Sequence, residues 1–191
     1  DPILSKRIGF MDRMSQDKNP LIVTAALAFM EGAVLFSIFG YFKSFNSRGH
    51  HKIPHFVSGI DASAKDENWH SLASAALHMQ CKKERAENGF HTKRQDTLLK
   101  KKIKEMAQVV YEHELRIIDR LFEKGDCPSV TKKELIEFLE DRVNIVLQRL
   151  DCPAMFDHPA GEISSWFYAQ LSKVKVPDFF AATQTQYVKN W

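Results

Sequence analysis

The segment PLIVTAALAFMEGAVLFSIFGYF, residues 20–42, is apolar throughout except for one central charge, Glu31. It is long enough to cross a bilayer, but an ionised carboxylate at its midpoint would be costly in lipid. The sequence contains no second segment of this kind. A helix that is apolar on all faces is also typical of the central helix of a bundle. We therefore expect a buried helix from Pro20 to about Asn46, and no membrane association.

The composition indicates one soluble globular domain. The chain has 191 residues, of which 44% are hydrophobic and 27% charged, enough to bury a single core without a signature of disorder. A net charge of +3, with basic and acidic residues interspersed, does not favour nucleic-acid binding. The three cysteines lack metal-ligand spacing; we expect free thiols in a reducing cytoplasm.

Helical periodicity continues through most of the chain, and no alternating strand pattern is present. Gly49 and Pro54 end the first helix, and a second one ends near Asn88. Further helices are predicted at Lys93–Lys124, at Thr131–Leu150 after a Thr131/Glu134 capping box, and at residues 163–171. We expect an all-α bundle over residues 1–175, and a flexible C-terminal tail over residues 176–191.

Glu31 is the first candidate for chemistry, because burying a lone carboxylate is unfavourable. It either takes up a proton or finds a cation. A protonated or hydrogen-bonded core glutamate, a glutamate facing a solvent pocket, and a metal ligand all remain open on this observation alone.

Glu67 and His70 lie three residues apart in AKDENWHSLA, residues 64–73. At that spacing both side chains leave a helix on one face and can reach one metal ion. The same spacing also arises by chance on helix surfaces. The neighbouring Asp66 could hydrogen-bond a ligand histidine and fix its tautomer.

Together, Glu31, Glu67 and His70 fit half of a di-iron carboxylate site, in which one glutamate comes from each of two helices and Glu-x-x-His from each of two others. The second half is not found in the sequence. Glu112 and His113 lack a partner at the required spacing and are interpreted as a solvated helix face. The remaining histidines mostly fall in predicted loops and are interpreted as surface: His50, His51, His55, His91 and His158.

The runs AALAFMEGAVLFSIFGYFKSF and KDENWHSLASAAL resemble the second half of the small, radical-generating subunit of class I ribonucleotide reductase, in the style of phage and viral members. The residues matching its [RK]-D-E-x-x-H motif are Lys65, Asp66, Glu67 and His70. EHELRIIDRLFEKG, LIEFLEDRVNIVLQRL and HPAGEISSWF resemble later segments of the family. The resemblance covers essentially the whole chain and implies part of a ferritin-like helical bundle.

The resemblance also implies roles. Glu31, Glu67 and His70 would bind metal in a di-iron or dimanganese centre, for which carboxylates and imidazole are suitable ligands. Asp66 matches the aspartate that links the metal site to the radical-transfer chain. Tyr187 matches the tail tyrosine that passes the radical to the large subunit, where ribonucleotides are reduced.

A group of apolar residues beyond Glu31 would shield the radical, although bundle core is at least as good an interpretation: Leu35, Phe36 and Phe39. Three tyrosines do not occupy the radical tyrosine's motif: Tyr41, Tyr111 and Tyr168.

The family's other metal ligands and its radical tyrosine precede the position that matches Asp1. Three ligands cannot hold two irons. We therefore expect a split or truncated small subunit of ribonucleoside-diphosphate reductase, active with an N-terminal half and the large catalytic subunit, and typically dimeric in the cytoplasm. Two alternatives stay open: a non-catalytic helical interaction module, and a different ferritin-like di-iron oxidase.

Overall fold

The computed structural model describes residues 2–172, which form seven α-helices and no β-strand. The helices are α1 (Pro2–Ser15), α2 (Pro20–Gly32), α3 (Phe36–Ser44), α4 (Pro54–Glu87), α5 (Lys93–Leu121), α6 (Lys132–Arg149) and α7 (Glu162–Ser172). The predicted all-α class is confirmed, and the bounds of α5 to α7 and the end of α4 lie close to the predicted ones. His55, predicted in a loop, lies in the first turn of α4.

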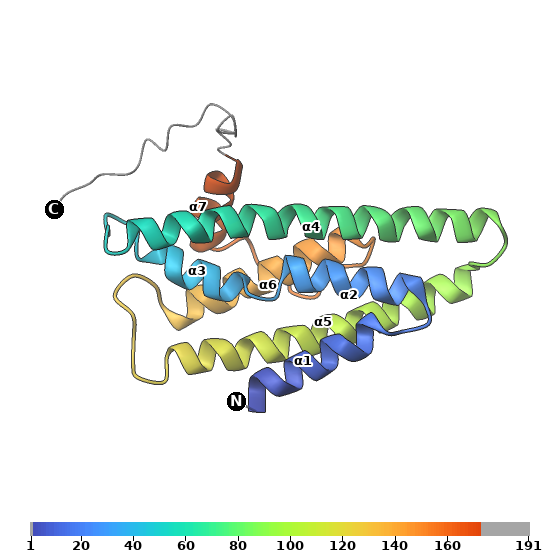
Figure 1. The fold of residues 1–191 in the computed structure, drawn as a ribbon, viewed down its shortest axis with the longest axis horizontal. Coiled ribbons are helices and arrows are strands. Elements are labelled where there is room, and N and C mark those ends of the chain that lie inside the picture. The colour runs from blue at the N-terminus through green and yellow to red at the C-terminus, as the bar shows by residue number, and fades with distance from the viewer. Residues whose placement is uncertain (1, 173–191) are drawn as a thin grey trace.

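Helix α2 occupies the centre of the bundle (Figure 1). It runs antiparallel to α4 and also packs against α1, α5 and α6. Six of its apolar residues are at most 3% exposed: Leu21, Ile22, Ala25, Ala26, Ala28 and Phe29. By length and composition Pro20–Ser44 could cross a membrane, but 61% of its most apolar window is buried within the bundle.

Two helices begin with a reciprocal capping box. The Thr131 hydroxyl accepts from the Glu134 N–H at 3.2 Å, and the Glu134 carboxylate accepts from the Thr131 N–H at 2.7 Å. This box was predicted and is confirmed. Thr92 and Gln95 form a second box at the start of α5, which the sequence analysis missed. Each box satisfies backbone donors that the first helical turn leaves without partners.

The sequence-based boundaries are wrong in two places. The N-terminal segment, for which no helix was predicted, forms α1. The single helix expected from Pro20 to Asn46 is two helices, because Leu35 adopts a left-handed conformation with φ 73°. The apolar residues on both sides of the break gave no sign of it.

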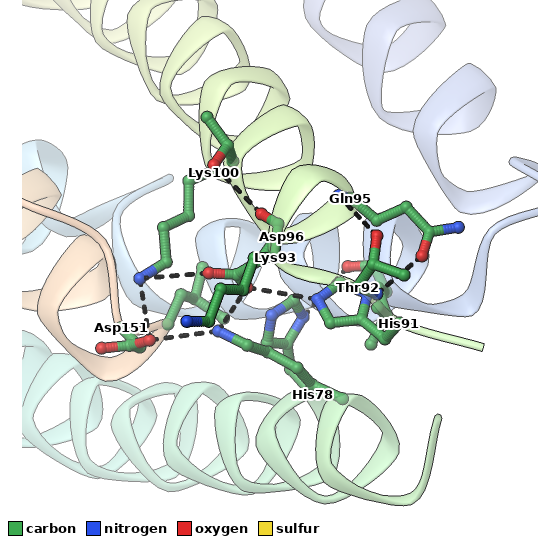
Figure 2. Close-up of polar contacts among 12 residues, drawn as sticks. His78, His91, Thr92, Lys93, Gln95, Asp96, Lys100 and Asp151 are labelled. Carbon is green, nitrogen blue, oxygen red and sulfur yellow. Dashed lines mark hydrogen bonds and ion pairs between the residues drawn. The ribbon is translucent and has the colours of Figure 1, made fainter. Parts of the chain in front are cut away.

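A network of ion pairs joins the end of α4, the start of α5 and the loop after α6 (Figure 2). Lys82 Nζ lies 2.7 Å from an Asp96 oxygen and 3.1 Å from an Asp151 oxygen. Lys100 also pairs with Asp151, at 2.9 Å. His91 Nε2 lies 3.2 Å from Asp96, and its side chain is only 8% exposed. The interpretation of His91 as a surface histidine is therefore wrong.

The predicted domain boundary after residue 175, the tail 176–191 and Tyr187 fall outside the described residues and stay predictions. The cysteines agree with the sequence analysis, since Cys81, Cys127 and Cys152 are all free thiols.

Candidate metal centre

Glu31, Glu67 and His70 converge between α2 and α4. Glu31 lies in the last turn of α2, and the other two project from α4 at the i, i+3 spacing that places them on one face. One potential ligand atom from each residue lies within 4.8 Å of the other two. Within residues 2–172, this is the only group of three or more histidine, cysteine, aspartate or glutamate side chains that could share one ion.

His70 Nδ1 is the nitrogen that faces both glutamates. It lies 3.3 Å from Glu67 Oε2 and 3.6 Å from Glu31 Oε2. The other ring nitrogen, Nε2, lies 3.7 Å from Asp66 Oδ1. Asp66 thus lies on the side of the ring opposite the two glutamates. Asp66 is 73% exposed, and a separation of 3.7 Å is too long for a hydrogen bond with His70.

The pKa values of Glu31 and Glu67 shift in opposite directions, because their side chains hydrogen-bond each other. A hydrogen bond with Glu67, together with burial, raises the pKa of Glu31 to about 7. The same hydrogen bond lowers the pKa of Glu67, and the hydrogen bond of His70 with Glu67 raises the pKa of His70. Two carboxylates this close repel each other when both are ionised. A metal ion would relieve that repulsion.

The donor set fits a first-row metal ion. Two carboxylate oxygens and an imidazole nitrogen suit iron or manganese, and no thiolate is among them. Glu31 and Glu67 are each 29% exposed and His70 is 54% exposed, so the site is open on one side. Three side chains leave further coordination positions to be filled by other groups.

A cavity of about 510 Å³ adjoins the two glutamates. Residues of α1, of α2, of the α2–α3 break and of α4 line this cavity. Six of them are apolar: Ile8, Met11, Leu27, Met30, Val34 and Leu35. The others are Arg7, Asp12, Ser15, Glu31 and Glu67. Leu35 lies at this cavity, as the pocket interpretation requires. Phe36 and Phe39, at 0% and 7% exposed, belong to the core instead.

The interpretation of Glu112 and His113 as a solvated face holds for Glu112 only. His113 is 8% exposed and meets the Phe10 ring edge-on, with centroids 5.9 Å apart. Its neighbour Glu114 is fully buried and binds Arg7 of α1. The apolar stripe of α5, which includes Val110 and Ile118, has a phase that could have identified both positions.

Glu114 and Arg142, like Lys43 of α3, are buried charged residues whose burial was not predicted from the sequence. Arg142 of α6 is 1% exposed and donates two hydrogen bonds to the carbonyl oxygen of Gly32, next to Glu31. Both residues lie on amphipathic helices, where charged side chains are usually exposed.

A bundle of antiparallel helices that directs carboxylates and a histidine toward one point defines the ferritin-like class of helical proteins. The model of the ribonucleotide reductase small chain family matches residues 1–162. The chain belongs to this family. No curated protein sequence matches the chain.

Among solved structures, the chain is similar to a putative class I ribonucleotide reductase from Bacillus halodurans, with a TM-score of 0.71 and 16% sequence identity. The similarity covers 89% of this chain and 60% of that one. This chain therefore spans about three fifths of the relative's length, and at this identity the similarity shows a common fold.

Proposed function

We propose that this chain supplies half of a dinuclear metal centre in the small subunit of a ribonucleoside-diphosphate reductase. The observation that carries the proposal is the convergence of Glu31, Glu67 and His70 in a chain of the small-chain family. A further set of ligands, from a helical segment outside residues 1–191, completes the centre. Iron is the preferred metal, and manganese fits the same donors.

Each side chain has a defined part in the proposed mechanism. Glu31 and Glu67 bind the metal through oxygen, and His70 binds through Nδ1, the atom directed at both carboxylates. Asp66, which lies beside Nε2, connects the site to the radical-transfer path. The largely apolar cavity beside the glutamates limits the access of water. When bound, the metal pair supplies the oxidising chemistry that generates a protein radical.

The proposal includes several partners. The radical leaves through Tyr187 toward a large catalytic subunit, where the ribonucleotide is reduced. The small subunit functions as a dimer in the cytoplasm. Family membership supports the association with a large subunit, and the relative's greater length is consistent with an additional ligand-bearing segment.

The hydrogen bond between Glu31 and Glu67 also suits a second candidate function, a helical interaction module that binds no metal. A Mn²⁺ titration distinguishes the metal-binding subunit from the interaction module. Binding is monitored as the loss of the electron paramagnetic resonance signal of free Mn²⁺. We expect one Mn²⁺ per chain in the wild type and in Glu87→Gln, a matched change of an exposed carboxylate on α4. Glu67→Ala removes a ligand and abolishes binding. Absence of Mn²⁺ binding by the wild type would favour the interaction module.

A second measurement tests the complete centre. The chain is purified together with a segment that supplies the remaining ligands, loaded with Fe²⁺ and exposed to oxygen. We expect close to two irons per complex and a tyrosyl radical signal, both absent in Glu67→Ala. An iron-loaded complex without a radical would contradict the reductase assignment while keeping the metal site.

A further inference from the structure

The helix break that follows Glu31 leaves a backbone carbonyl without its helical partner. Ala33 N–H and Val34 N–H both donate to the Phe29 carbonyl, at 2.9 and 3.2 Å. In a continuous helix the Phe36 N–H would donate to the Gly32 carbonyl, but here it donates to Ala33, at 3.3 Å. The Gly32 oxygen, one residue after Glu31, is released from the helix.

Arg142 binds this released carbonyl. Its Nε and Nη2 atoms donate to the Gly32 oxygen at 2.8 and 2.5 Å. The guanidinium also lies 3.7 Å from the centre of the Phe36 ring and 5.7 Å from that of Tyr168. No ion pair of Arg142 is present among residues 2–172, so a buried cation is held by a carbonyl and two rings. Burying a charge without a carboxylate partner is costly.

Glu114 acts on the other side of the same break. Its carboxylate accepts from the Ser37 hydroxyl at 2.6 Å and from Arg7 Nη1 at 2.5 Å. The backbone N–H of Leu35, the residue with φ 73°, also hydrogen-bonds this carboxylate. The Gly32 carbonyl and the Leu35 N–H at the break therefore each have a buried charged partner, Arg142 of α6 and Glu114 of α5.

We propose that Arg142 and Glu114 are positioning residues for the metal ligand Glu31. They fix the end of α2 by holding the backbone from Gly32 to Ser37 in its broken conformation, which sets where the Glu31 carboxylate stands relative to Glu67 and His70. The proposal rests on the metal-binding function proposed above. Ligands must be held within a fraction of an ångström to bind a metal well, and residues that orient ligands change affinity by about 10- to 100-fold when removed.

Arg142→Met tests the proposal, because it removes the two donors and keeps an unbranched side chain in the core. Val143→Ala is the control: it removes buried apolar volume from the next position on α6 and keeps both donors of Arg142. Nuclear magnetic resonance of the metal-free chain reports the backbone shifts of residues 32–37 and the Glu31 side-chain carboxyl shift. Mn²⁺ binding gives the affinity.

In Arg142→Met we expect the Leu35 shifts to move toward helical values, the Glu31 carboxyl shift to change, and the Kd for Mn²⁺ to rise about 10- to 100-fold. Val143→Ala lowers stability and leaves all three readouts at wild-type values. If Arg142→Met behaves like Val143→Ala, Arg142 is only a packing residue and the proposal is wrong.

Glu114→Gln keeps the test decisive if Arg142→Met does not fold. It preserves the size of the side chain and removes the charge, and we expect the same direction of change at Leu35 and Glu31. Unchanged shifts in this variant would overturn the proposal. If the wild type binds no Mn²⁺ at all, the proposed metal function is wrong. The chemical shifts of Leu35 and Glu31 then still show whether Arg142 and Glu114 set the position of Glu31.

Discussion

His78 is a buried histidine of α4 whose charge state depends on folding. It is 0% exposed, its Nδ1 lies 3.0 Å from the Leu21 carbonyl, and its Nε2 has no partner. Figure 2 shows His78 in the same region as Asp96, the residue that pairs with Lys82. Burial lowers the pKa of His78 to about 4, and the charges of Lys82 and His91 also lower it. The hydrogen bond with the Leu21 carbonyl and the charge of Asp96 raise this pKa, but by less.

The lowered pKa predicts that the protein loses stability on acidification. Between the ordinary pKa of about 6.5 and the folded value of about 4, the unfolded chain binds a proton at His78 and the folded chain does not. Stability from this group is complete above pH 6.5 and falls by about 3 kcal/mol as the pH drops to 4. Chemical denaturation across this range should give a flatter profile for His78→Gln than for the wild type. Parallel profiles for the two proteins would show that His78 is not buried in its neutral form.

Individual residues differ in how well the sequence predicts them. Glu31 stands out as the single charge of an apolar helix, and Glu67 and His70 are marked by their spacing. Arg142 and Glu114 are equally buried, but each lies among other charged residues on an amphipathic helix. Both positions are in phase with the apolar stripes of their helices, so their burial could have been predicted. The groups that they bind come from other helices and could not.

At the scale of elements, α2 and α4 approach closely because small residues meet between them. Ser71 of α4 donates to the Ala28 carbonyl of α2 at 3.0 Å. A Cβ atom on Gly32 would contact Ser71 and lie 2.5 Å from a Val146 methyl group of α6. Glycine is therefore required at position 32, directly after Glu31, because α2, α4 and α6 pack closely there.

We predict that Gly32→Ala destabilises the protein by about 1–3 kcal/mol through overpacking. It should also weaken Mn²⁺ binding, because α2 must move away from the α4 residues that share the site. Urea denaturation and Mn²⁺ titration measure the two effects. Gly59→Ala, on α4, is the matched control, because a Cβ atom at Gly59 would meet no atom of the described residues within 4 Å. Alanine at this exposed helical position is expected to stabilise the protein by about 0.5–1 kcal/mol. Equal stability of the two variants would contradict this account of the interface.

The helices themselves follow from local signals, namely apolar periodicity, capping boxes and glycines. The break between α2 and α3 does not, because its conformation is imposed by Arg142 and Glu114 from elsewhere in the bundle. Helix α1 was missed for a related reason. Among those of its side chains that the structure describes, Phe10 and Met11 are the buried apolar ones, and the contact of Arg7 with Glu114 also holds α1 in place.

At the scale of the whole molecule, the described helices bring together three candidate ligand side chains, whereas dinuclear carboxylate bundles use six. The family motif made the fold class predictable from the sequence, and it also selected three residues that the structure brings together; their role as metal ligands stays a prediction. The extent of the site was also indicated, since no second Glu-x-x-His was found. The proposal that a further helical segment completes the site is a prediction that the metal-binding and iron-loading measurements test.

The most direct test of the account is to locate the metal by anomalous X-ray diffraction. Crystals of the chain, assembled with the segment that completes the site and grown with Mn²⁺, are measured at the manganese absorption edge. The account predicts an anomalous peak within ligand distance of Glu31, Glu67 and His70 Nδ1 together. A peak at other residues, or fully loaded crystals in which these three side chains contact no metal, would contradict it.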